Sequence, residues 1–302
     1  MIRLSIITPS FNQGRFLERT IRSVVEQDYP GLEYIICDAC SSDDTASVLN
    51  RYEGRVRVVR ETDGGQADAV NKGIQRTNGE VIGWLNSDDT YMPGALSTVM
   101  GYFVRHPDVD VVYGDAHLID AEDRVVGRYY TQSWDPRQLV ERPFLCQPAV
   151  FFRRRMIQKF GLLDADLNYT LDYEYWLRLA RGGARFAYAP VTLASSRVHD
   201  DTKTLTGGLR IHHELSVVLK RYAGYVPDGW LLTQTQAVVR ERGVEHFKSP
   251  VAFALQVAVV SWRLSLQHNG SISPWLVRST LRTLGSGLVK TALRRPVALP
   301  LS

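Results

Sequence analysis

Acidic side chains follow three of the apolar segments that the sequence predicts as strands. Carboxylates are costly beside a buried sheet, so two adjacent ones at the end of an apolar strand indicate a bound ligand. Their hard oxygens suit Mg²⁺ or Mn²⁺, which keep several waters and bridge to a substrate diphosphate. The alternative is that the two adjacent carboxylates, Asp88 and Asp89, cap a helix. The carboxylates are Asp38 after residues 34–37, Asp63 after residues 56–59, and Asp88 with Asp89 after residues 81–85.

The elements that must position these side chains alternate between strand and helix. β-Branched runs predict the strands, and apolar residues three or four apart predict the helices. Apolar strands separated by helices favour a parallel sheet covered on both faces, which binds ligands at the carboxyl ends of its strands. We expect strands at 4–8, 34–37, 56–59, 81–85 and 109–113, and helices at 16–25, 42–49 (capped by Ser42, Asp43 or Asp44), 67–75 and 93–103.

The charge is unevenly distributed along the chain. The protein has 302 residues, 44% of them hydrophobic and 23% charged, which excludes wholesale disorder and supplies a core. Its net charge is +4, but residues 246–302 hold seven basic residues and no Asp or Glu, so the first 245 residues carry −3. The acidic part and the basic part therefore need separate explanations.

The cysteines and the apolar runs bear on the compartment. Three cysteines, an odd number, argue against a disulfide framework and favour a reducing, cytoplasmic environment. Cys37 and Cys40 form a C-x-x-C, but zinc would need a second pair and only Cys146 remains. The longest apolar stretch, residues 251–262, is too short to span a bilayer, and Pro9 interrupts the N-terminal run too early for a signal peptide.

An ordered set of motifs carries a family resemblance. Together they resemble family 2 glycosyltransferases, over about two thirds of the chain and with the family's spacing. The resemblance implies the GT-A fold, which is a Rossmann-like, mostly parallel α/β sheet flanked by helices. The segments are 5–12, 17–30, 35–45, 63–73, 79–80, 84–89, 113–115, 147–153 and 171–179.

The resemblance implies inverting transfer of a sugar from a nucleotide diphosphate donor to an acceptor hydroxyl, assisted by Mn²⁺ or Mg²⁺. Asp38 then accepts a hydrogen bond from the imide N–H of uracil or thymine and Phe11 packs beside the base, which favours UDP- or dTDP-sugars. Asp89 is implied as the direct metal ligand, completed by His199, with a structural histidine as the alternative. The implied nucleotide-binding set is Pro9, Phe11, Asp38, Asp63, Gln66 and Asp88.

The same resemblance implies an Asp172 general base at the start of an amphipathic helix. A base must take the proton of the acceptor hydroxyl, and helix capping is the alternative role of Asp172. Lys203 and Arg197 are weaker candidates for phosphate contact. The residues expected around the sugar and the acceptor are Asp68, Asn71, Asp115, Gln147 and Glu174, of which Glu174 is also the alternative base.

Beyond residue 205 the alternation stops, so we expect a catalytic domain over 1–205 and a helical extension over 206–302. Its basic character has two interpretations. One is a helical bundle that packs on protein or forms a homo-oligomer. The other is a patch that docks on anionic lipid at the inner face of the cell membrane, where a lipid-linked acceptor is found. Nucleic acid is disfavoured because no recognition motif accompanies the charge. Helices are expected at 209–222, 230–241, 246–267 and 274–293.

Other activities fit the sequence less well. No G-x-G-x-x-G follows the first strand, which excludes a nicotinamide-dependent oxidoreductase. Processive family members carry Gln-x-x-Arg-Trp, and no Arg-Trp pair occurs here, which indicates addition of a single sugar to a glycan or lipid-linked acceptor in surface polysaccharide assembly. The alternative is a non-catalytic, membrane-associated relative that binds nucleotide sugar without turnover.

Overall fold

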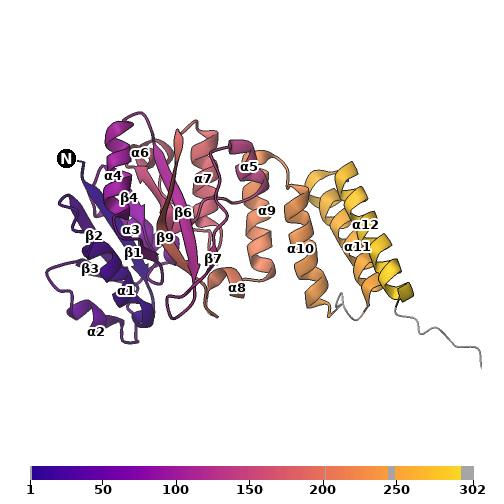
Figure 1. The fold of residues 1–302 in the computed structure, drawn as a ribbon, viewed down its shortest axis with the longest axis horizontal. Helices are drawn as coiled ribbons and strands as arrows, with labels where there is room; N and C mark the ends of the chain where they lie inside the picture. The colour runs from indigo at the N-terminus through magenta and orange to yellow at the C-terminus, as the bar shows by residue number, and fades with distance from the viewer. Residues whose placement is uncertain (1, 201, 244–248, 294–302) are drawn as a thin grey trace, which may run out of the picture. The chain divides into compact units, whose positions relative to one another are not determined.

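A computed structural model describes residues 2–200, 202–243 and 249–293. The chain divides into two compact units, Met1–Thr206 and Gly207–Ser302. The first contains one mixed sheet with helices on its faces, and the second is helical (Figure 1). In the described residues no helix is both long and apolar enough to cross a membrane.

The sheet has the strand order β3-β2-β1-β4-β8-β6-β9-β5, with β7 paired to β6. The first four strands in this order are parallel, as their apolar sequences predict. Strand β8 then lies antiparallel between β4 and β6, so β6 does not pair with β4 as a purely parallel sheet would require. The bounds are β1 Leu4–Ser10, β2 Leu32–Asp38, β3 Arg57–Arg60, β4 Val81–Trp84, β5 Thr90–Tyr91, β6 Val111–Ile119, β7 Val125–Arg128, β8 Val150–Arg153 and β9 Phe186–Arg197.

Helices cover both faces of this sheet. Leu4 and Ile6 of β1 belong to the core beneath α1, α2 and α4, whereas Ile7 lies against α3 on the opposite face because strand side chains alternate. The helices of the first unit are α1 Gly14–Val25, α2 Thr45–Asn50, α3 Gln66–Gln75, α4 Ala95–Arg105, α5 Pro136–Glu141, α6 Arg155–Phe160, α7 Leu171–Arg181 and α8 Lys203–Thr206, with a 3₁₀ turn at Gln147–Ala149.

The loops that follow β1 and β2 are tied together by side chains. The Asp43 carboxylate accepts hydrogen bonds from the backbone N–H of Gly14 at 2.9 Å and of Thr45 at 3.1 Å, so it joins the starts of α1 and α2. Ser42 does not cap α2 as expected, since Asp44 occupies the N-cap position. The backbone N–H of Ser42 donates to Asn12 Oδ1 at 2.9 Å. This cross-linking holds the carboxyl ends of β1 and β2 in register.

The second unit consists of α9 Leu209–Ala223, α10 Asp228–Glu241, α11 Pro250–Asn269 and α12 Pro274–Leu293. Helices α11 and α12 pack side by side (Figure 1). The expected helix over 246–267 is described from Pro250 onward, and its predicted start at His246 lies outside the described residues.

The three cysteines of the first unit are free thiols, with Cys37 and Cys146 buried and Cys40 exposed.

Gly73 allows α3 to approach the sheet closely. A Cβ at this position would clash with Ile7 of β1 and lie 3.2 Å from the Cys37 sulfur of β2. Overpacking of this kind costs about 1–3 kcal/mol. We therefore expect Gly73→Ala to lower the free energy of unfolding by that amount in urea titrations. The matched control is Gly229→Ala in α10, where a Cβ meets nothing within 4 Å. Equal stability of the two variants would contradict the close approach.

Candidate active site

The carboxyl ends of β1 to β4 meet at one edge of the sheet and bring the first group of predicted residues together. Pro9 is buried in β1 opposite Cys37, and Phe11 directly follows the strand with 61% of its side chain exposed. An aromatic ring this exposed still has most of its surface in water, so it remains available to stack on a planar ligand.

Asp38 lies beside this ring position but is not a free acceptor. Its side chain is 1% exposed, and Oδ1 accepts a hydrogen bond from Ser41 Oγ at 2.5 Å. Oδ2 lies 3.2 Å from Nε of Arg60, whose side chain is half exposed. Arg60 pairs with Asp38 in the β2–β3 register. Its position directly after the predicted third strand was the sequence signal for this contact, and the sequence analysis did not use it. A ligand that reaches Asp38 therefore also meets a guanidinium.

The adjacent carboxylates Asp88 and Asp89 have opposite environments. Asp89 is 3% exposed, and its oxygens accept hydrogen bonds from the backbone N–H of Arg197 at 2.9 Å and from Asn86 Nδ2 at 3.2 Å. Burial, and then the neighbouring charge of Asp88, raise the pKa of the Asp89 carboxyl well above its ordinary value. Asp89, expected from the sequence as the direct metal ligand, is therefore buried and already hydrogen-bonded.

Asp88 is the partner of His199. Its Oδ2 lies 3.2 Å from Nε2 of the histidine, which follows β9. The other ring nitrogen, Nδ1, is buried and has no hydrogen-bond partner among the described residues. Nε2 is the ring nitrogen that faces Asp88, and an imidazole nitrogen beside a carboxylate oxygen is a pair of ligand types that fits a divalent cation. Within the described chain no cluster of three potential ligands of the His, Cys, Asp or Glu type occurs.

Arg197 is a structural residue and not the phosphate contact considered from the sequence. Its guanidinium is fully buried and donates from Nε to the Asp88 carbonyl at 2.8 Å. It also donates to the Asp120 carbonyl and to Asp123 Oδ1, each at 2.5 Å. The cation lies over the ring of Phe16, 4.8 Å from its centroid, and the same ring packs on His199. Arg197 thus fixes the backbone of Asp88 and, through Phe16, the histidine.

A polar network extends from these acids across the edge of the sheet. Asn86 donates to Asp89 and to Gln147 Oε1, at 3.2 and 3.0 Å, and accepts from Gln66 Nε2 at 2.7 Å. Gln66 Oε1 in turn accepts from Lys203 Nζ at 3.0 Å. The structure therefore joins the predicted residues Gln66, Gln147 and Asp89 through Asn86, which the sequence analysis did not single out.

Asp172 is the second residue of α7. It lies in the first turn, where the helix N-terminus favours a negative charge, and it is half-buried. The pKa of the Cys146 thiol is raised well above its ordinary value by burial, then by Asp89 and then by Asp172. The charges of Asp89 and Asp172 therefore both raise the pKa of this thiol, which precedes Gln147 in the chain.

Other expected sugar or acceptor contacts are engaged elsewhere. Both polar atoms of the Asn71 amide bond the backbone of Leu163, each at 2.9 Å, in a buried setting. Glu174 is buried and paired with Arg178 at 2.7 Å. These two side chains position loops and α7, which corrects their expected roles.

The remaining acids mostly bond their own surroundings. Asp63 accepts from the N–H of Gly65 and Asp68 from the N–H of Gly64, each at 2.9 Å, so both shape the loop before α3. Asp68 is also paired with Lys72 at 3.0 Å. Asp115 accepts from the Tyr188 hydroxyl at 2.7 Å. These contacts leave Asp63, Asp68 and Asp115 near the edge of the sheet but already hydrogen-bonded.

Comparison with known proteins decides the family. The sequence profile described as glycosyl transferase family 2 matches residues 5–163. The chain belongs to this family. A glycosyltransferase of Rickettsia typhi is 26% identical over 278 residues, covering 87% of this chain and 83% of the relative. A chondroitin synthase of Pasteurella multocida is 26% identical over 67% of this chain, but only 21% of the synthase is covered.

Solved structures confirm that this family 2 glycosyltransferase has the GT-A fold. Residues 1–349 of S. aureus TarS, in complex with UDP-GlcNAc, superpose with a TM-score of 0.60 at 12% identity, over 97% of this chain and 92% of that fragment. A mannosyltransferase of Pyrobaculum calidifontis, in complex with GDP-Man and Mn²⁺, has a TM-score of 0.60 at 17% identity, over 97% of this chain and 88% of that one. At these identities the likeness extends to the fold alone.

Arg197 should be the most costly arginine to remove from this glycosyltransferase. Arg197→Ala leaves two carbonyls and the Asp123 carboxylate without their buried cation, so we expect a loss of about 3–5 kcal/mol in unfolding free energy by urea titration. Arg124→Ala is the matched control, because that side chain is 74% exposed and its ion pairs lie at the surface. Similar unfolding midpoints for the two variants would contradict the anchoring role.

Proposed function

We propose that the protein is an inverting glycosyltransferase that moves one sugar from a nucleotide diphosphate donor to an acceptor hydroxyl. The acceptor oxygen attacks the anomeric carbon, the bond from that carbon to the diphosphate breaks, and the hydroxyl proton passes to a carboxylate. The observation that carries the proposal is the pairing of Asp88 with His199 at the edge of the sheet where β1 ends beside Phe11.

Asp88 and His199 are proposed to hold Mn²⁺ or Mg²⁺ together with the donor diphosphate. The cation, when bound, would neutralise charge on the departing diphosphate. Asp88 takes the ligand role first expected of Asp89, because its carboxylate faces His199 while that of Asp89 is buried and hydrogen-bonded. The mannosyltransferase with Mn²⁺ and GDP-Man supports a divalent cation by analogy.

The nucleotide base is proposed to stack on Phe11 and to meet Asp38 and Arg60 at its edge. A carboxylate accepts from an imide N–H and a guanidinium donates to a carbonyl oxygen, which together match uracil or thymine. This favours UDP- or dTDP-sugars, and the TarS complex with UDP-GlcNAc is consistent with such a donor. Gln66 and Gln147 are proposed to line the sugar and acceptor side.

Asp172 is proposed as the general base. The helix N-terminus favours a negative charge at this position, which suits a carboxylate that must take the acceptor proton. The proposed acceptor is a glycan or lipid-linked sugar in surface polysaccharide assembly, and the proposed location is cytoplasmic and peripheral to the membrane.

Substitution of the two adjacent aspartates separates their roles. We expect Asp88→Asn to weaken Mn²⁺-dependent binding of UDP at least tenfold, roughly the loss seen when a metal site is disturbed. Asp89→Asn should retain the metal dependence, because an amide oxygen still accepts from the Arg197 N–H. Calorimetric titration with UDP, with and without Mn²⁺, measures both. Metal-independent UDP binding by the unmodified protein would overturn the assignment.

Asp172→Asn tests the base directly. We expect UDP release from the UDP-sugar that best stabilises the protein to fall by about 10²–10⁴-fold, with unchanged binding of UDP and Mn²⁺. Asp108→Asn, an exposed surface pair with Arg185, is the control and should release UDP at the normal rate. Normal release by Asp172→Asn would show that another group takes the proton. No release by the unmodified protein with any donor would favour the non-catalytic alternative.

A further inference from the structure

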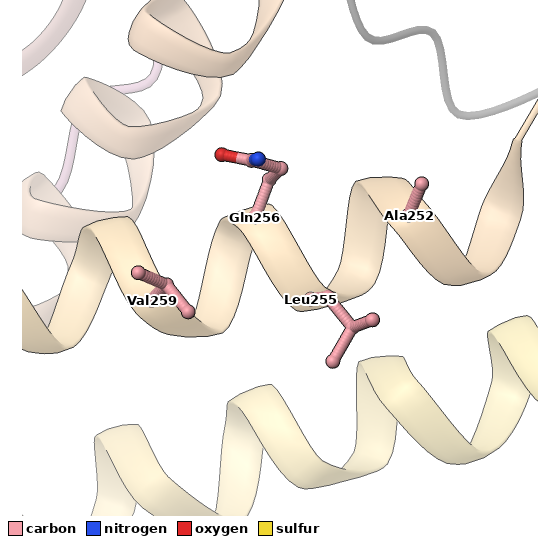
Figure 2. Close-up of a pocket in the computed structure, with 4 residues that line it drawn as sticks. All are labelled: Ala252, Leu255, Gln256 and Val259. Atoms are coloured by element: carbon pink, nitrogen blue, oxygen red, sulfur yellow. The ribbon is translucent and has the colours of Figure 1, made fainter.

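Helix α11 exposes an apolar stripe on the side opposite its packing face. Its buried residues, among them Ala254, Val257, Ala258 and Ser261, lie on one side of the helix. The exposed side is apolar as well, although solvent-facing helix surfaces are normally polar. Figure 2 shows the centre of this stripe, where a shallow pocket is lined by Ala252, Leu255, Gln256 and Val259. Leu255, Val259 and Leu266 are 51%, 63% and 53% exposed.

The neighbouring helix α12 adds exposed aromatic and basic residues. Trp275 and Leu281 are each more than half exposed. Arg278 and Arg282 are exposed between and beside them. Trp, Leu and Arg interleaved in this way are typical of helices that lie at a membrane–water interface, where the indole sits at headgroup level.

The charges on these helices decide what can cover them. Every charged residue that the sequence places between 246 and 302 is basic. A second copy docked through a two-fold axis would set this surface against itself, so Arg278 and Arg282 would meet arginines with no carboxylate to pair with. An anionic partner satisfies the same residues. Lys248, Arg294, Arg295 and the side chain of Lys290 add to this charge in the sequence but lie outside what the structure describes.

We propose that the exposed sides of α11 and α12 dock on the surface of an anionic lipid bilayer. The docking surface consists of Ala252, Leu255, Val259, Arg263, Leu266, Trp275, Arg278, Leu281 and Arg282. The apolar side chains enter the headgroup region and the guanidinium groups remain among the lipid phosphates. The attachment is peripheral, because no described helix is long and apolar enough to span the bilayer. It does not depend on the proposed transfer reaction, since lipid binding needs no donor, metal or turnover.

The test is co-sedimentation of the full-length protein with vesicles. We expect binding to vesicles of phosphatidylcholine and phosphatidylglycerol at 7:3, little binding to phosphatidylcholine alone, and release at high salt. Arg278→Glu/Arg282→Glu should lower the partition coefficient by roughly tenfold or more. Leu255→Ser/Val259→Ser should also weaken binding, and circular dichroism checks that each variant is folded.

The matched control is Arg105→Glu/Arg137→Glu, which changes the net charge equally at exposed positions of the first unit. It should bind vesicles like the unmodified protein. Quenching of tryptophan fluorescence by brominated phosphatidylglycerol needs no change to the docking surface and should be reduced in Trp275→Phe.

Three outcomes would overturn the proposal. The first is equal binding to neutral and anionic vesicles. The second is the absence of binding to either. The third is a concentration-dependent dimer, seen by light scattering, that Leu255→Ser/Val259→Ser dissociates while vesicle binding is absent. The third outcome would show that a second copy covers this surface.

Discussion

The guanidinium of Arg197 is the interaction on which the candidate active site depends. It is a buried cation, so hydrogen bonds and an ion pair must offset the free-energy cost of removing it from water. Its partners come from three regions of the chain: the Asp88 carbonyl, the turn between β6 and β7 at Asp120 and Asp123, and the Phe16 ring of α1. Because these partners are far apart in sequence, one side chain fixes the acidic loop, the turn and α1 relative to one another.

The same residue also separates the two adjacent aspartates. The Arg197 N–H donates to Asp89, and Thr20 donates to the carbonyls of Ser87 and Asp89, so the loop is held with Asp89 inward. The inward carboxylate of Asp89 is desolvated, and this burial raises its pKa above the ordinary value. Asp88 then faces the other way, toward His199. The two adjacent carboxylates therefore have different surroundings, and this difference is the basis on which we propose Asp88 as the ligand.

The two units use charge in different ways. In the first, acids gather at the edge of the sheet and most of them bond backbone N–H groups or arginines nearby. In the second, basic residues from α11 and α12 remain exposed beside apolar ones, with no acid in the same stretch of sequence to neutralise them. The first pattern supports the proposed site for a cation with a diphosphate, and the second supports the proposed docking on an anionic surface.

The sequence by itself determined the elements with strong local signals. The four parallel strands, the acidic edge, the amphipathic α7 with Asp172 at its start and the basic C-terminal helices all follow from periodicity and from charges close together in the chain. The pairing of Glu174 with Arg178 could also be predicted from the sequence, because the two residues are four positions apart on one helix. Only the tertiary structure decided the insertion of β8 between β4 and β6, the engagement of Asn71 by Leu163, and which of Asp88 and Asp89 is buried. The hydrogen bonds that decide these features join residues 61 to 111 positions apart in the chain, with Gln147, Leu163, Arg197 and His199 as the distant partners. No local sequence pattern specifies which distant partner a buried polar group will meet.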